Sequence, residues 1–120
     1  MNQPALALQI ASILYDKKAQ DIVVLEVGHL TVLTDHMVIA TGRSAIQVKT
    51  LAEEVDDRLG QTGTVLRRKE GQNEGGWIVL DYGTVMVHLF HQEERAYYNL
   101  ERLWEDGHNR LILPFDQTAS

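Results

Sequence analysis

Two stretches in the first half of the chain carry apolar residues at the spacing of a helix. The first begins at Pro4, a residue favoured in a first helical turn, and is predicted to end near Lys17 and Lys18, whose charges suit the negative end of the helix dipole. The second begins at Ser44, and Gln47 three residues later completes the pattern of a capping box. Its apolar stripe consists of Val48, Leu51, Ala52, Val55 and Leu59.

A third helical pattern lies near the end of the chain. We expect one helix from about Gln92 to Trp104. The second helix is expected to end at Gly60 and Gly63. Tyr97 and Tyr98 are adjacent in the third helix and cannot both point inward, so one of them must be partly exposed. The third stripe consists of Tyr97, Leu100, Leu103 and Trp104.

Five β-rich runs separate these helices. The first two, residues 22–27 and 38–41, are expected to pair, and a third is expected to start at residues 65–66. Residues 77–82 and 85–90 are separated by a tight turn and therefore predict an antiparallel hairpin. The order of helices and strands predicts an α/β (α+β) fold in which helices flank a five-stranded mixed sheet.

The composition limits the class of protein. The chain has 120 residues, no cysteine and a formal net charge of −6, which predicts a single cytoplasmic domain without disulfides. We expect a core at about 5–104 and a C-terminal tail at 105–120. No apolar stretch is long enough for a bilayer, so no membrane contact is expected. The acidic balance disfavours direct nucleic-acid recognition, so a partner near nucleic acid is expected to be a basic protein.

Catalytic patterns are weak. His88 and His91 are three residues apart and would lie on opposite faces of a strand, so no metal site is predicted. No strand carries the pair of carboxylates, two residues apart, that would hold magnesium for nucleotidyl transfer. Accordingly no catalytic residue and no cofactor are expected. The alternative is a residual nucleotide-binding or nucleotidyltransferase-like enzyme that uses the turn at residues 42–44 to hold a phosphate.

The alternation in the last two strands makes both faces of the sheet apolar. Trp77, Val79 and Asp81 share one face of their strand, and the next strand adds Met86 and His88 to a face of the same kind. Either helices cover both faces and these residues are core, or part of one face stays open as a protein-binding patch rich in aromatic residues and methionine. The sequence pattern alone leaves both possibilities open.

Several separated motifs resemble the ribosomal silencing factor (Iojap) family. They occupy residues 34–44, 47–49, 76–83, 87–90 and 94–104, and the resemblance extends over about residues 5–104. It implies a mixed α/β domain related to nucleotidyltransferases but without their catalytic carboxylates. It also implies a cytosolic protein that binds the large ribosomal subunit through large-subunit ribosomal protein fourteen. Occupation of that site would block joining of the small subunit and reduce translation when nutrients are scarce.

The resemblance also suggests which residues make the contact. Homodimers occur among relatives, so a dimerisation module is a further hypothesis. One departure from the family concerns His36 and Met37, which stand where the family usually has aromatic residues. The family's signature positions fall on Trp77, Asp81, Tyr82, Gly83, His88, Phe90, Arg95, Tyr98, Leu100 and Trp104. The expected partner-binding residues are Trp77, Val79, Asp81, Met86, His88, Glu94 and Tyr98, together with Met37 and Ile39 of the second strand.

Overall fold

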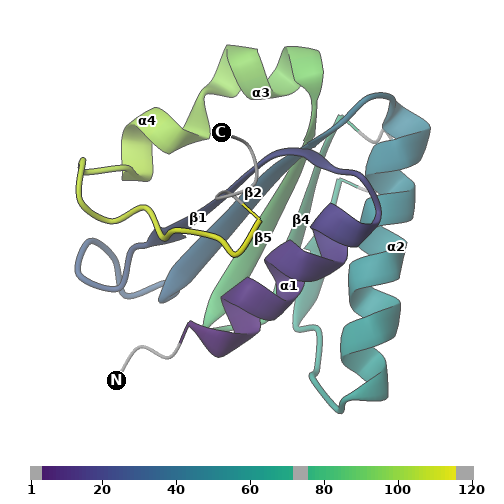
Figure 1. The fold of residues 1–120 in the computed structure, drawn as a ribbon, viewed down its shortest axis with the longest axis horizontal. Helices are drawn as coiled ribbons and strands as arrows, with labels where there is room; N and C mark the ends of the chain where they lie inside the picture. Colours follow the sequence, from purple (N-terminus) through teal and green to yellow (C-terminus); the bar gives the residue numbers. More distant parts are fainter. Residues whose placement is uncertain (1–3, 72–75, 116–120) are drawn as a thin grey trace.

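The fold is a mixed sheet flanked by helices on both sides, as the sequence predicts. A computed structural model describes residues 4–71 and 76–115. Figure 1 shows α1 and α2 together on one side of the sheet, and α3 and α4 on the other. The elements are α1 (Ala5–Asp16), β1 (Gln20–Glu26), β2 (His36–Gly42), α2 (Ala45–Gln61), β3 (Arg68–Glu70), β4 (Trp77–Asp81), β5 (Val85–His91), α3 (Gln92–Tyr98) and α4 (Leu100–Trp104).

The strand order in the sheet is β1-β2-β5-β4-β3. The β2–β5 pair is parallel and the other three pairs are antiparallel, which confirms the predicted mixed sheet and the hairpin between β4 and β5. None of the helices in the described part of the chain is long and apolar enough to cross a membrane.

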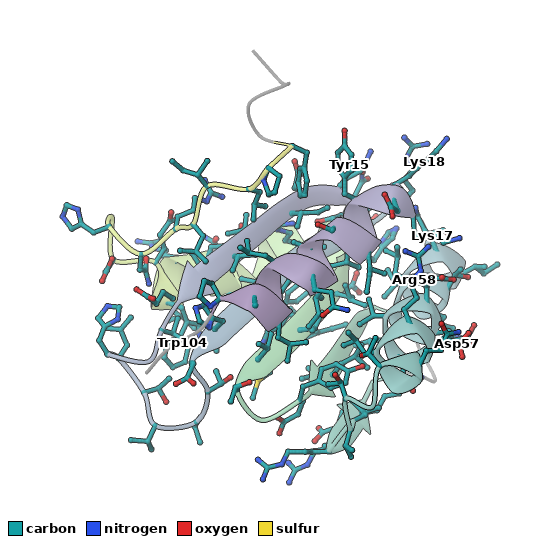
Figure 2. All side chains as sticks on the ribbon, turned by 60° about the horizontal axis from the view of Figure 1, so that its bottom comes forward. Tyr15, Lys17, Lys18, Asp57, Arg58 and Trp104 are labelled. Carbon is teal, nitrogen blue, oxygen red and sulfur yellow. The ribbon has the colours of Figure 1, made fainter. Side chains whose placement is uncertain are left out.

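One face of the sheet is fully covered by α1 and α2. The stripe of α2 predicted from the sequence is buried in every member, and the side chain of Ser44 accepts a hydrogen bond from the backbone N–H of Gln47. On the outer surface, Arg58 of α2 pairs with Asp16 of α1 at 3.3 Å and with Glu54 of its own helix at 2.8 Å. Figure 2 shows Arg58 close to Lys17 on this charged outer surface. This side of the molecule is therefore a closed core beneath a charged exterior.

The other face of the sheet is covered only in part. Leu100 and Trp104 pack with Phe90 of β5 and with apolar side chains of β1 and β2 in a second, smaller core. The predicted single helix is broken at Asn99, whose φ of 46° lies in the left-handed region. The predicted stripe is therefore wrong for Tyr97 and Leu103, which are exposed, because the break changes the direction of the helix and redirects its side chains.

Two further boundaries differ from the predictions. The third strand is Arg68–Glu70, and Val65, expected in it, is exposed. Hydrogen bonding to β4 decides this strand, since Arg68 and Glu70 lie in register with residues of β4. Helix α2 continues through Gly60 to Gln61, and Gly63, with a φ of +85°, follows its end.

The C-terminal arm packs along the free edge of β1. The backbone N–H of Leu111 donates to the carbonyl of Val24, and Leu25 forms a bridge with Arg110. In Figure 1 the yellow segment follows this edge. Leu113 enters the core beneath α1 and is 1% exposed. Residues beyond the helices therefore contribute to the packing of the main core.

We predict that Leu113→Ala lowers the free energy of unfolding by about 2–5 kcal/mol, because it leaves a cavity in a closed core. Ile112→Ala is a matched control, since the neighbouring side chain is 77% exposed and its truncation should change stability by less than about 0.5 kcal/mol. Urea denaturation followed by circular dichroism measures both. Equal effects of the two substitutions would show that the arm does not hold Leu113 in the core.

Candidate protein-docking surface

The incompletely covered face is built by the register of three strands. Val79 lies opposite His88, and Asp81 lies opposite Met86, so the predicted face residues of β4 and β5 are brought together. Strand β3 adds Arg68 opposite Asp81. Val79, Asp81 and Met86 are partly exposed, as is Trp77 on the same face of β4. Tyr98 of α3 joins them at one end through its contact with Trp77. We call this set the open patch: Trp77, Val79, Asp81, Met86 and Tyr98.

Trp77 is the centre of an aromatic cluster. Its ring stacks on Phe90 with centroids 4.9 Å apart, and Tyr98 packs against it at 4.7 Å with the planes tilted by 45°. Tyr97 contacts Tyr98 edge to face at 5.0 Å. Tyr98 is 47% exposed and Trp77 is half-buried. Large amphipathic rings that are held in place but still reach water are typical of protein-binding anchors.

His88 lies underneath this cluster. Its side chain is 5% exposed, and its Nδ1 accepts a hydrogen bond of 3.1 Å from the indole Nε1–H of Trp77. Burial lowers the pKa of His88 to about 4, so the ring is neutral at pH 7 and carries its proton on Nε2. Within the described part of the chain, Nε2 has no hydrogen-bond partner. The structure thus places His88 beneath the surface and not on it.

Two carboxylates lie at this surface, Asp81 within the open patch and Glu94 beside it. Asp81 accepts a hydrogen bond of 2.8 Å from the backbone N–H of Gly83, whose φ of +88° is readily adopted only by glycine. Asp81 therefore also stabilises the β4–β5 turn. Glu94 lies over Gly76, where an added Cβ would come within 3.0 Å of its carboxylate, and it pairs with His91 at 3.4 Å. The predicted acidic rim is thus next to the aromatic cluster, with one member engaged in a turn.

Besides His88, two further expected contact residues do not reach the surface. Met37 is 3% exposed and Ile39 is 0% exposed, because both belong to the second core, which includes Leu100. Their assignment to the contact surface is therefore corrected: they are core residues of β2 that pack beneath α4. His36 is also buried, on the face toward α1 and α2, and burial lowers its pKa. The departure from the family pattern at His36 and Met37 consequently lies in the interior.

Arg95 attaches α3 and α4, the helices that cover part of this face, to the sheet. Its guanidinium donates to the backbone carbonyl of Asp21, to Oγ1 of Thr41 at 2.8 Å, and to Glu101 from Nε at 3.3 Å and Nη2 at 2.8 Å. Burial opposes the charge of Glu101, but Arg95 outweighs it and holds the pKa of this carboxyl below its usual value. Arg95 is a signature position of the family, yet the sequence pattern did not indicate this role, because its partners in β1 and β2 are more than 50 residues away.

The turn considered for phosphate binding is used for helix capping. Oε1 of Gln47 accepts from the backbone N–H of Arg43, and Ser44 caps the helix. Gly42 is required for packing, because a Cβ there would lie 2.7 Å from a methyl group of Val48. The described residues include no group of three or more side chains that could hold a metal ion. The features at this turn are thus explained by folding.

Comparison with known proteins gives a consistent result. The profile of a family described as "Ribosomal silencing factor during starvation" matches residues 1–119. The chain is 39% identical over 107 residues to the ribosomal silencing factor RsfS of Bacillus subtilis, covering 89% of this chain and 91% of that protein. It is 41% identical over 91 residues to the RsfS of Chromobacterium violaceum, covering 76% and 75%. An Arabidopsis protein named "Protein Iojap-related, mitochondrial" is 35% identical over 101 residues, with 80% of this chain and 54% of that protein covered.

Solved structures show the same fold. A crystal structure of a Chromobacterium violaceum protein superposes with a TM-score of 0.83 at 36% identity and covers 87% of each chain. A second, from Bacillus halodurans, gives a TM-score of 0.77 at 37% identity and covers 89% of this chain and 97% of that one. Since both the sequence and the whole arrangement of helices and strands match over most of their length, the chain belongs to the ribosomal silencing factor family.

Proposed function

We propose that this protein is a translational repressor that binds the large ribosomal subunit through large-subunit ribosomal protein fourteen and sterically blocks joining of the small subunit in the cytoplasm. Membership of the ribosomal silencing factor family supports a role at the ribosome. The observation that carries the docking site is the half-exposed pair Trp77 and Tyr98 on an incompletely covered sheet face. No catalytic step is part of this proposal.

The open patch has the composition of an interface core with a charged rim. Trp77 and Tyr98 would be the anchors, and Val79 and Met86 would widen the apolar centre. Asp81 and Glu94 would meet lysine or arginine side chains of a basic ribosomal protein, which agrees with the net charge of −6. A second copy of this chain is a competing occupant of the same patch, and light scattering at several protein concentrations distinguishes the two.

We predict that Trp77→Ala or Tyr98→Ala weakens binding to purified large subunits about 30-fold or more, because truncating an anchor costs about 2 kcal/mol. Each variant should also lose the ability to prevent assembly of whole ribosomes, measured by sedimentation of mixed subunits through a sucrose gradient. Circular dichroism establishes that the variants remain folded.

The matched control for Tyr98 is Tyr15. It is 50% exposed, compared with 47% for Tyr98, and it likewise packs on an aromatic ring, Phe115, at 4.2 Å. Tyr15 lies at the end of α1 (Figure 2), and α1 packs on the other side of the sheet from α3 (Figure 1), so Tyr15→Ala should bind like the wild type. Full binding by a folded Trp77→Ala variant would refute the docking site, and undiminished assembly at saturating wild-type protein would refute the proposed block.

We further predict that Glu94→Gln slows association with the large subunit at low salt and that the difference shrinks as salt is added, because rim charges act mainly on the association rate. Glu53→Gln, an exposed change of the same charge on α2, is the control and should have a smaller effect. Stopped-flow or biosensor kinetics at several salt concentrations measures both rates. Equal slowing by the two substitutions would mean that only the net charge matters and would remove Glu94 from the proposed rim.

A further inference from the structure

The pose of Trp77 depends on a histidine that lies beneath it. Trp77 is directly opposite Phe90 in the β4–β5 pair, and His88 is two residues away along β5, at the diagonal position. Diagonal neighbours on one sheet face are within reach of an aromatic side chain. The indole therefore covers both rings, stacking on Phe90 at 4.9 Å and donating Nε1–H to Nδ1 of His88 at 3.1 Å.

His88 is itself held firmly. It lies in register between Ile39 of β2 and Val79 of β4, near the middle of the sheet, and only 5% of its surface is exposed. Because His88 is held in place, its Nδ1 fixes the orientation of the indole that donates to it. Without this bond, the indole N–H of the partly buried Trp77 would turn to water for a partner, and the ring would be free to leave the aromatic stack.

The free-energy cost of burying His88 indicates that this residue is not present to stabilise the fold. Its Nε2–H is buried without an acceptor in the described part of the chain, and an unsatisfied buried donor destabilises the fold. Its direct neighbours across the strands, Ile39 and Val79, are apolar, so an apolar side chain would satisfy the packing without this cost. The hydrogen bond to Trp77 is the polar interaction that His88 makes and that an apolar side chain would lack.

We infer that His88 is a positioning residue of the open patch: it holds the indole of Trp77 against Phe90 and Tyr98 in the orientation that docks, and it does not contact the partner. This inference rests on the proposed function only for its effect on docking, whereas the hydrogen bond itself is a property of the free protein. A neutral ring is needed for Nδ1 to accept, and the lowered pKa of His88 is consistent with that.

The direct test is nuclear magnetic resonance of the full chain labelled with ¹⁵N. The chain has two tryptophans, and Trp77→Phe assigns their indole signals. We expect a scalar coupling between the indole nitrogen of Trp77 and Nδ1 of His88, and slow exchange of the indole proton with water. His88→Leu should abolish the coupling and speed the exchange. Absence of the coupling in the wild-type protein overturns the inference.

The functional test compares three variants. His88→Leu should be at least as stable as the wild type in urea denaturation, yet bind large ribosomal subunits about tenfold more weakly, the effect of losing one net hydrogen bond. His88→Asn places an oxygen where Nδ1 stood and should restore part of the affinity. His36→Leu removes the other buried histidine whose Nε2 makes no hydrogen bond in the described part of the chain; it lies on the opposite face of the sheet, 3.9 Å from Glu26, and its loss should leave both coupling and affinity unchanged.

The outcomes separate the two proposals. Full affinity of His88→Leu, or an equal loss in His88→Leu and His88→Asn, overturns the positioning role. If the wild-type protein does not bind large subunits at all, the proposed function fails. The coupling and the exchange rate then still decide whether His88 fixes Trp77.

Discussion

The limited reach of the α3–α4 cover determines what this molecule presents to a partner. Arg95 ties α3 to the backbone of β1 and to Thr41 of β2, and its ion pair with Glu101 reaches the start of α4. The cover is thereby held over one half of the sheet face, where it buries Met37 and Ile39, and it leaves the part formed by β4 and the start of β5 open. Because the bonds of Arg95 to Thr41 and Glu101 are partly buried, they are stronger than surface ion pairs and keep this boundary fixed.

Most of the fold follows from periodicity. The two-residue alternation correctly grouped Trp77 with Val79 and Asp81 on β4, and Met86 with His88 on β5, since each strand side chain can point only to one side or the other. The pattern did not show that this is the face opposite α1. The capped helix α2 was predicted equally well, because Ser44 and its apolar stripe are local signals. The helix break was not predicted, because a left-handed Asn99 is a rare conformation that packing of Leu100 against the sheet makes favourable.

The candidate site was predictable in its centre and not at its borders. Trp77 and Tyr98 were identified through the motif, and their contact places them together. Burial of Met37 and Ile39, in contrast, depends on where α3 and α4, which are distant in the sequence, pack on the sheet. The position of His88 beneath the indole of Trp77 was also not predictable from the sequence. The alternation shows which side chains share a face of the sheet, but not which ring lies over which.

An apolar face that stays open must be kept from pairing indiscriminately, and the two edges of this sheet are arranged accordingly. At one edge the C-terminal arm hydrogen-bonds to Val24 and Glu26 of β1 and so occupies backbone groups that would otherwise pair with another chain. At the other edge β3 has only three residues, Arg68, Lys69 and Glu70, and all three are charged. Short, charged or covered edges resist strand addition. What remains available is the face itself, where recognition depends on the shape and orientation of side chains such as Trp77 and not on the backbone. If the open patch docks a partner as proposed, it would select that partner by the fit of a few fixed rings, and the hydrogen bond that holds the indole would then contribute to specificity as well as to affinity.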